Sequence, residues 1–106
     1  MNEGSTPRWV PFIYREFYNV PRMIVFQESG QWYLLDGSFD EKLDEYPPDY
    51  QVFELPDALL SNMPTNWSDL PALALRRLGV VPVTSVRLDE TRRKQLDGSV
   101  LGQVRP

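Results

Sequence analysis

The alternation of hydrophobic and polar positions first becomes regular near the start of the chain. Residues 9–18 are rich in aromatic and β-branched side chains, a composition typical of a strand. Pro11 cannot donate to a sheet ladder, so the strand is predicted to start near Phe12 or to lie at a sheet edge. The two-residue period assigns its side chains to opposite faces: Phe12, Tyr14, Glu16 and Tyr18 to one, and Ile13, Arg15 and Phe17 to the other.

Two apolar runs farther along the chain predict a β-hairpin. Residues 22–28 and 31–35 each contain four consecutive apolar side chains, and Ser29-Gly30 between them suits a tight turn. Continuous apolar runs indicate burial on both faces near the middle of the hairpin. Residues 51–55 and 80–88 are predicted as two further strands.

Residues 69–78 carry the clearest helical pattern. Ser68 or Asp69 suits the start of this helix, and Gly79 suits the position after its last residue. Four side chains at helical spacing predict its buried stripe: Leu70, Leu73, Ala74 and Leu78. Shorter helical turns are predicted at residues 58–60 and 90–96. Residues 1–8 are predicted to be flexible, and residues 99–106 to form a loose tail or an edge strand.

The order of these elements predicts the fold class. Strands that follow one another through short connections favour an antiparallel sheet. We therefore predict a single α+β domain over residues 9–106, with a curled antiparallel sheet of four to five strands. The helix over residues 69–78 covers one face of this sheet. A small SH3-like or partly open β-barrel is the alternative.

The composition removes most catalytic chemistries. The 106 residues include no cysteine and no histidine, which excludes disulfides, thiolate or imidazole metal sites and Ser-His-Asp triads. The six glycines never have the spacing of a phosphate-binding loop. We expect no cofactor. The sequence shows neither a secretion signal nor an apolar run of about 18 residues, so a cytoplasmic location is predicted.

The charges are unevenly distributed along the chain. The net charge is −4, yet residues 36–57 hold eight acids and one base, whereas residues 76–106 hold seven bases and three acids. We favour charges that balance within the fold, and the alternative is an acidic loop that docks on a basic protein. A calcium-loop pattern begins at Asp36 but fails because Glu41 occupies the position that requires glycine. A carboxylate-based or metal-assisted enzyme is the alternative that uses Asp36, Asp40, Glu41, Asp44 and Glu45.

The thirteen aromatic side chains exceed what one small core encloses. Some are therefore expected at the surface, where Tyr and Trp commonly anchor interfaces. Pro47-Pro48-Asp49-Tyr50 matches the Pro-Pro-x-Tyr ligand of WW domains. The favoured interpretation is a proline-stiffened turn whose Tyr46 and Tyr50 pack back on the sheet. Nucleic acid is not expected, because residues 1–53 carry nine acids and four bases.

The sequence thus predicts a small non-catalytic domain that binds a protein partner through an aromatic and acidic surface. One version is an inhibitor or immunity-type protein that covers the basic site of a nuclease or similar toxin. No membrane contact is expected, and association of identical copies is a further alternative. The candidate partner-binding residues are Trp9, Tyr14, Tyr18, Asp40, Glu41, Asp44, Glu45, Tyr46 and Tyr50.

Overall fold

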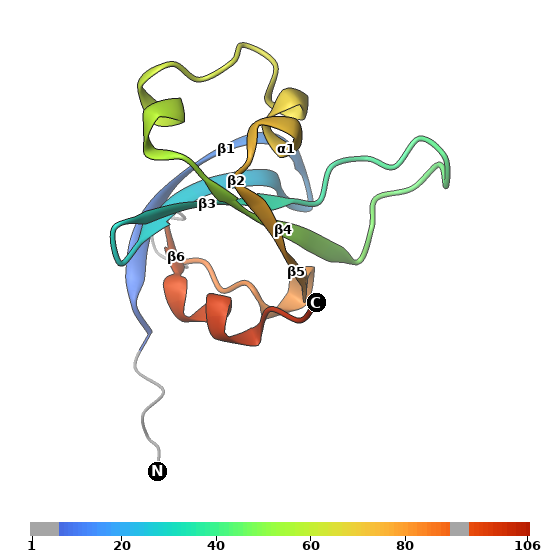
Figure 1. The fold of residues 1–106 in the computed structure, drawn as a ribbon. Coiled ribbons are helices and arrows are strands. Elements are labelled where there is room, and N and C mark those ends of the chain that lie inside the picture. Colours follow the sequence, from blue (N-terminus) through green and yellow to red (C-terminus); the bar gives the residue numbers. More distant parts are fainter. Residues whose placement is uncertain (1–6, 90–93) are drawn as a thin grey trace.

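The computed structural model describes residues 7–89 and 94–106, which form one antiparallel sheet (Figure 1). Its strands run in the order β5-β4-β3-β2-β1-β6, and the sheet is not closed. The predicted antiparallel sheet is confirmed, with more strands than expected and less helix. The strands are β1 (Trp9–Tyr18), β2 (Val20–Glu28), β3 (Gln31–Asp36), β4 (Asp49–Leu55), β5 (Arg76–Pro82) and β6 (Gln95–Asp97). One short helix, α1 (Leu70–Leu73), is accompanied by 3₁₀ turns at Asp57–Ser61, Trp67–Asp69, Val83–Ser85 and Gly98–Gln103.

The β2–β3 hairpin forms as predicted because its turn has the required backbone. Ser29 and Gly30 adopt φ angles of 54° and 81°, and Glu28 pairs directly with Gln31. Positive φ at both central positions is the geometry of a tight hairpin turn that follows the twist of the strands. The local sequence therefore sets the register of the two central strands.

Both faces of the sheet are covered, and β2 contributes to the core on each. Ile24 and Phe26 belong to a cluster under the C-terminal part of the chain, and Met23 and Val25 to a cluster under residues 57–75. Figure 1 shows residues 57–75, here called the crossover segment, above the sheet and the C-terminal part below it. This two-sided cover explains the continuous apolar run, because successive side chains of a strand point to opposite faces.

The long helix predicted over residues 69–78 is wrong. The α-helix ends at Leu73, Ala74 is extended with ψ of 154°, and the Leu75 N–H donates to the Glu54 carbonyl at 2.7 Å. Pairing with β4 therefore replaces helical hydrogen bonds from this point. The predicted stripe is divided: Leu70 is buried in the crossover cluster, Leu73 is 47% exposed, and Leu78 packs in the opposite cluster.

Gly79 lies inside β5 and does not end a helix. Its φ is +148°, and a Cβ at this position would collide with the backbone of Arg105. The close approach exists because Val80 and Arg105 exchange two backbone hydrogen bonds, of 2.6 and 2.9 Å. Glycine is required here because the Arg105 backbone leaves no room for a Cβ, and not because a helix ends at this residue.

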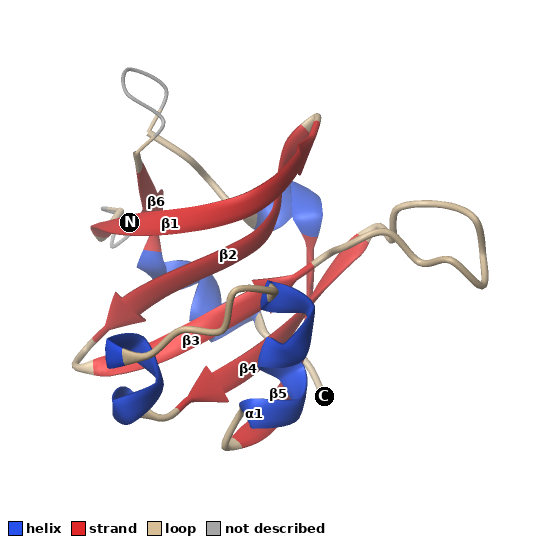
Figure 2. Cartoon of the chain, turned by 90° about the horizontal axis from the view of Figure 1, so that it is seen from above, coloured by secondary structure: helices blue, strands red, loops and turns tan. Residues whose placement is uncertain are grey.

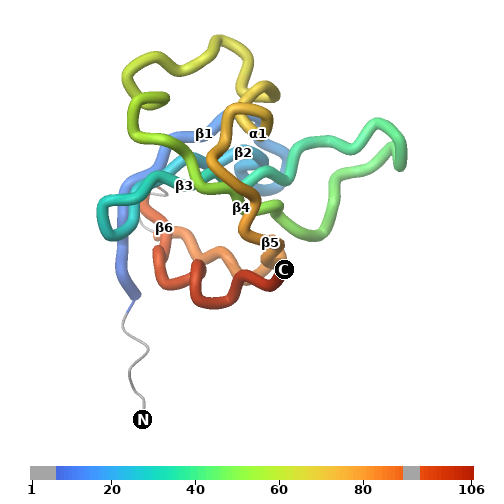
Figure 3. The backbone as a smooth tube through the Cα atoms, in the orientation of Figure 1, coloured from blue at the N-terminus to red at the C-terminus, as the bar shows by residue number. Residues whose placement is uncertain are grey.

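The C-terminal part of the chain packs against the sheet. Residues 98–103 form a 3₁₀ turn with Val100 buried, so residues 99–106 do not form a loose tail. Figure 3 shows this part of the chain running from β6 to β5 under the sheet. The predicted strand 80–88 ends early, at Pro82. Of the predicted helix 90–96, residues 90–93 lie outside the described residues and Gln95–Asp97 is strand β6.

Asp97 links the first described residues to the C-terminal part of the chain through hydrogen bonds. Its carboxylate accepts hydrogen bonds from the Arg8 N–H at 3.1 Å and from the Ser99 N–H at 2.9 Å. Arg8 also pairs with Glu28 at 2.6 Å. Residues 1–6, predicted to be flexible, lie outside the described residues. Within the described ranges, no helix has the length and apolar character needed to cross a membrane.

Candidate functional site

Large apolar side chains are exposed on the C-terminal half of β1. Ile13, Tyr14, Phe17 and Tyr18 are each 46–57% exposed, and this group is called the β1 tip below. Exposed apolar side chains that touch one another, as the rings of Tyr14 and Phe17 do, commonly mark a contact surface, whereas Ile13 lies on the other face of the strand. Tyr14 and Tyr18 were expected among the partner-binding residues, whereas Ile13 and Phe17 were not.

Glu16 changes the direction of the side chains that follow it. Its φ is 62°, in the left-handed region that non-glycine residues rarely occupy. Regular alternation predicted Tyr14 and Phe17 on opposite faces. That prediction is wrong, because the two rings are in edge-to-face contact, 6.3 Å apart. The left-handed backbone of Glu16 thus places the Phe17 ring next to the Tyr14 ring.

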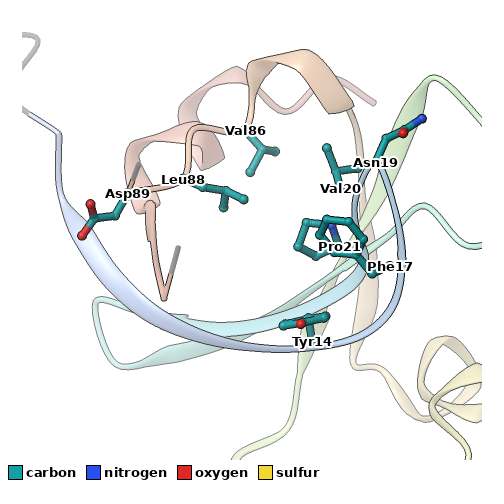
Figure 4. Close-up of a pocket in the computed structure, with 8 residues that line it drawn as sticks. All are labelled: Tyr14, Phe17, Asn19, Val20, Pro21, Val86, Leu88 and Asp89. Carbon is teal, nitrogen blue, oxygen red and sulfur yellow. The ribbon is translucent and has the colours of Figure 1, made fainter. Parts of the chain in front are cut away.

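Tyr14 and Phe17 of the β1 tip form one wall of an open pocket of about 670 Å³ (Figure 4). Figure 4 shows Val86 and Leu88 across this space from Tyr14, Phe17 and Pro21. The remaining lining residues are Asn19, Val20 and Asp89. An apolar hollow with a few polar groups at its margin suits an apolar side chain of a ligand or partner.

An acidic loop over residues 37–48 projects beside the tip and is held by aromatic contacts. Tyr46 stacks on Tyr18 with ring centres 4.6 Å apart and an interplanar angle of 13°. Phe39 meets Tyr46 edge-on at 5.1 Å, and the Phe39 N–H donates to the Glu16 carboxylate at 3.3 Å. Desolvation, followed by a hydrogen bond to Glu16 and the charge of Glu16, raises the pKa of Tyr46. The left-handed Glu16 therefore joins the loop to β1.

Arg22 holds the base of the acidic loop from inside the protein. This arginine is buried, and its Nε–H and Nη1–H donate to the carbonyls of Tyr18 and Pro47 at 3.2 and 3.3 Å. Its guanidinium carbon lies 4.6 Å from the centre of the Tyr46 ring, a distance at which cation and ring attract. A buried charge needs such partners to offset its desolvation. The loop base and the β1 tip are thus parts of one packed unit.

The end of the acidic loop carries the predicted carboxylates. Asp40 and Glu45 exchange two backbone hydrogen bonds, of 2.9 and 3.3 Å, and Asp44 takes a φ of 55°. The Asp40 side chain accepts the Lys42 N–H at 3.0 Å, which closes a compact turn. Glu41, Asp44 and Glu45 are exposed. Figure 2 shows this loop projecting from the body of the fold.

The acidic loop also borders a second hollow of about 500 Å³, near the base of β4. Four carboxylates line it with Lys42, namely Asp36, Asp40, Glu41 and Asp49. The described part of the chain contains no group of three or more carboxylate, imidazole or thiolate side chains placed to hold a metal ion.

Tyr50 is not at the surface, so its expected place in the contact surface needs correction. Its side chain is 1% exposed, and its hydroxyl donates to the Pro21 carbonyl at 2.6 Å. Burial raises the pKa of Tyr50 to about 12. The Pro-Pro-x-Tyr motif is consequently inaccessible to a WW domain in the folded protein, and Tyr50 packs inward as the favoured interpretation predicted.

The other candidate residues divide by position. The structure brings Tyr14, Tyr18, Tyr46 and the loop carboxylates to one end of the molecule. Trp9 is 39% exposed but pairs with Asp97 at the opposite end of β1, about 17 Å from Tyr14 at the usual rise per residue. Sequence reasoning missed Phe17, Arg22 and the opposing wall at Val86 and Leu88. Their roles depend on backbone conformation and distant segments.

Comparison with known proteins adds no further identification. No protein-family model, curated protein or solved structure matches this chain. The interpretation of the site therefore rests on its geometry and chemistry.

Proposed function

We propose that this protein is a non-catalytic domain that binds a protein partner through the β1 tip and the acidic loop. One observation carries the proposal: four large apolar side chains within residues 13–18 are each about half exposed, and the rings of Tyr14 and Phe17 are in contact. Exposing this much apolar surface on one stretch of strand costs hydration free energy that a partner would recover. The packed Tyr18–Tyr46 stack makes the surface preorganised, which lowers the entropy lost on binding.

The charge of the neighbouring loop indicates the kind of partner. Six carboxylates and one lysine lie between residues 36 and 49. A concentrated negative patch at the margin of an apolar surface accelerates encounter with a positively charged protein and disfavours acidic ones. An inhibitor or immunity-type protein that covers the basic site of a nuclease or similar toxin is the version that fits this charge. A cytoplasmic location belongs to the same proposal.

A carboxylate-based enzyme has weaker support. General acid–base work with paired carboxylates needs one of them in a pocket that raises its pKa. Glu41, Asp44 and Glu45 are instead exposed at the end of the loop, and the larger pocket is lined mainly by apolar side chains. The geometry favours recognition over catalysis.

The proposal is tested by capture with matched surface variants. The tagged wild-type protein is compared with Phe17→Ser/Tyr18→Ser, and with Leu73→Ser/Leu75→Ser as the control. The control side chains are 47% and 59% exposed but lie on the crossover segment. Bound proteins from the source lysate are quantified by mass spectrometry, and circular dichroism verifies the fold of each variant.

We expect one stoichiometric basic protein that the wild type and the control retain equally. Its recovery should fall at least about tenfold with the tip variant, and it should fall again as salt rises from about 50 to 200 mM. Equal recovery by the tip variant would contradict the proposal, and so would the absence of any specific protein. If the protein instead forms a concentration-dependent dimer that the tip substitutions abolish, the partner is a second copy of this chain.

A further inference from the structure

We propose that the partner supplies an extended basic segment that adds to the edge of β1 beyond Phe12, where no described strand pairs, and places an apolar side chain in the adjoining pocket. This inference rests on the proposed function and specifies its binding mode. Two features that lie side by side carry it: an incompletely paired strand edge and a pocket that opens at the same edge. Addition of a strand to an exposed edge is a common way for folded domains to bind extended peptides.

The outer edge of β1 is paired over only part of its length among the described residues. β6 pairs with Trp9, Val10 and Pro11, and the Phe12 N–H donates to the Lys94 carbonyl at 3.3 Å. No described strand pairs with residues 13–18 on that side. Exposed edges of this kind present unpaired backbone groups to another chain.

The alternation of the backbone identifies which groups face that edge. Because the Phe12 N–H points toward β6, the N–H and C=O of Tyr14, two residues later, point to the same side. The Tyr14 carbonyl accepts a hydrogen bond from the Arg15 guanidinium at 3.0 Å. This contact is exposed, and an incoming backbone N–H can replace it at little cost. Tyr14 thus offers one donor and one acceptor to an added strand.

The pocket lies where a side chain of the added strand would point. Tyr14 belongs to both features, since its backbone faces the edge and its ring lines the pocket. Val86 and Leu88 form the far wall, across the space from β1 (Figure 4). Alternate residues of a strand face the same side of a sheet, so one apolar residue can enter the pocket while its neighbours remain outside.

The charges at the end of this edge near Glu16 favour basic neighbours for that apolar residue, whereas Arg15 and Lys94 lie beside Tyr14 and Phe12. Glu16 and the acidic loop lie beyond the tip, and the pocket lining contains no lysine or arginine. Arg15 lies over the Trp67 ring at 4.6 Å, on the crossover face. A second copy of this chain is a poorer occupant, because pairing through this edge would bring two acidic loops toward each other.

The inference is tested with random peptides of about 12 residues displayed on phage and selected on the wild-type protein at about 150 mM salt. The best sequence is synthesised with single N-methyl groups at each backbone position in turn. Affinities are measured by titration calorimetry, and binding is mapped by ¹H–¹⁵N chemical shifts. Tyr14→Pro removes the edge donor and the ring, whereas Tyr14→Ala removes only the ring. Amide exchange of Tyr14 is also measured in the free protein.

We expect selected peptides with one large apolar residue flanked by Lys or Arg. Shifts should concentrate at residues 13–17 and 86–89, and N-methylation should weaken binding at least about tenfold at every second position. Tyr14→Pro should weaken binding at least about tenfold beyond Tyr14→Ala, and the free Tyr14 amide should exchange rapidly. Acidic residues beside the apolar one are not expected, because Glu16 and the acidic loop would repel them.

Several outcomes would overturn the inference. They are an N-methyl profile without a two-residue period, acidic consensus sequences, shifts confined to the crossover face, or a slowly exchanging Tyr14 amide in the free protein. Failure to select any peptide, while the tip variant still loses the captured protein, would remove this binding mode and leave the proposed function standing. Failure of both experiments would remove both.

Discussion

β1 and β2 are neighbouring antiparallel strands of similar apolar content, yet their side chains have opposite surroundings. Tyr14 pairs with Ile24 across the two strands, and their exposed fractions are 46% and 0%. Residues 21–26 of β2 are all buried, whereas residues 13–18 of β1 are all exposed. The difference comes from the described segments that cover the sheet, which lie over β2 and its partners and do not cover the end of β1. Apolar content alone therefore does not separate core from contact surface.

The largest expected effect tests this contrast directly with two phenylalanines. Phe26→Ala should lower the free energy of unfolding by about 3–5 kcal/mol, because it leaves a cavity in the core. Phe17→Ala should change it by no more than about 0.5 kcal/mol, because the ring is 57% exposed. Urea denaturation followed by fluorescence gives both values. Similar losses for the two variants would show that the β1 tip belongs to the core.

The next effect concerns the backbone contact that holds the C-terminal part of the chain over the sheet. Gly79→Ala should cost about 2–3 kcal/mol, since it adds strain at positive φ and a collision with Arg105. Gly30→Ala is the matched control, with φ of +81° and open space around it, and should cost about 1 kcal/mol. Thermal unfolding compares them. Equal costs would mean that the contact with Arg105 contributes nothing.

The third effect is the pH dependence that Tyr50 confers on the core. Its pKa of about 12 in the folded protein lies above the ordinary value of 10.0, so its stabilising effect is complete below pH 10. That contribution, on the order of 2 kcal/mol, should be lost as the pH rises from about 10 to 12. Tyr50→Phe should be less stable by about 1–3 kcal/mol at pH 7, because the Pro21 carbonyl loses its donor.

The alkaline part of that prediction is checked by urea denaturation of both proteins at several pH values. The slope of stability against pH above 10 should be shallower for Tyr50→Phe than for the wild type. Parallel slopes would contradict the assignment of the alkaline loss to Tyr50.

The smallest expected effect on stability lies at the end of the acidic loop. Asp44→Asn/Glu45→Gln should change the free energy of unfolding by no more than about 0.5 kcal/mol, because both side chains are exposed. The same substitutions should reduce the salt dependence of partner capture. A large loss of stability would show that these carboxylates support the fold, and an unchanged salt dependence would remove them from the contact surface.

Sequence reasoning succeeded where short-range chemistry decides the structure. The Ser29-Gly30 turn fixes its hairpin through residues that are neighbours in the chain, and the apolar run 23–26 correctly indicated burial on both faces. The helix over residues 69–78 was wrong because the leucine spacing fits equally well two separate clusters on opposite faces of the sheet. The hydrogen bond from the Leu75 N–H to the Glu54 carbonyl, between the start of β5 and the neighbouring β4, selects between these alternatives.

The candidate site was predictable only in part for a similar reason. Tyr14, Tyr18 and the loop carboxylates follow from composition and charge, and the structure places them at one end of the molecule. The position of the Phe17 side chain depends on the left-handed φ of Glu16, and no local sequence pattern predicts that conformation. Tyr50 was wrong as a contact residue, although its inward packing was the favoured interpretation, and its hydroxyl bonds to Pro21, far away in the sequence.

The most direct test of the central claim is hydrogen–deuterium exchange of the wild-type protein, free and bound to its captured partner. Binding through the β1 tip and the acidic loop predicts slower exchange at residues 13–18 and 38–46, with no change over the crossover segment at residues 57–75. Slower exchange over residues 57–75, with residues 13–18 unchanged, would contradict the account and place the contact surface on the other face of the sheet.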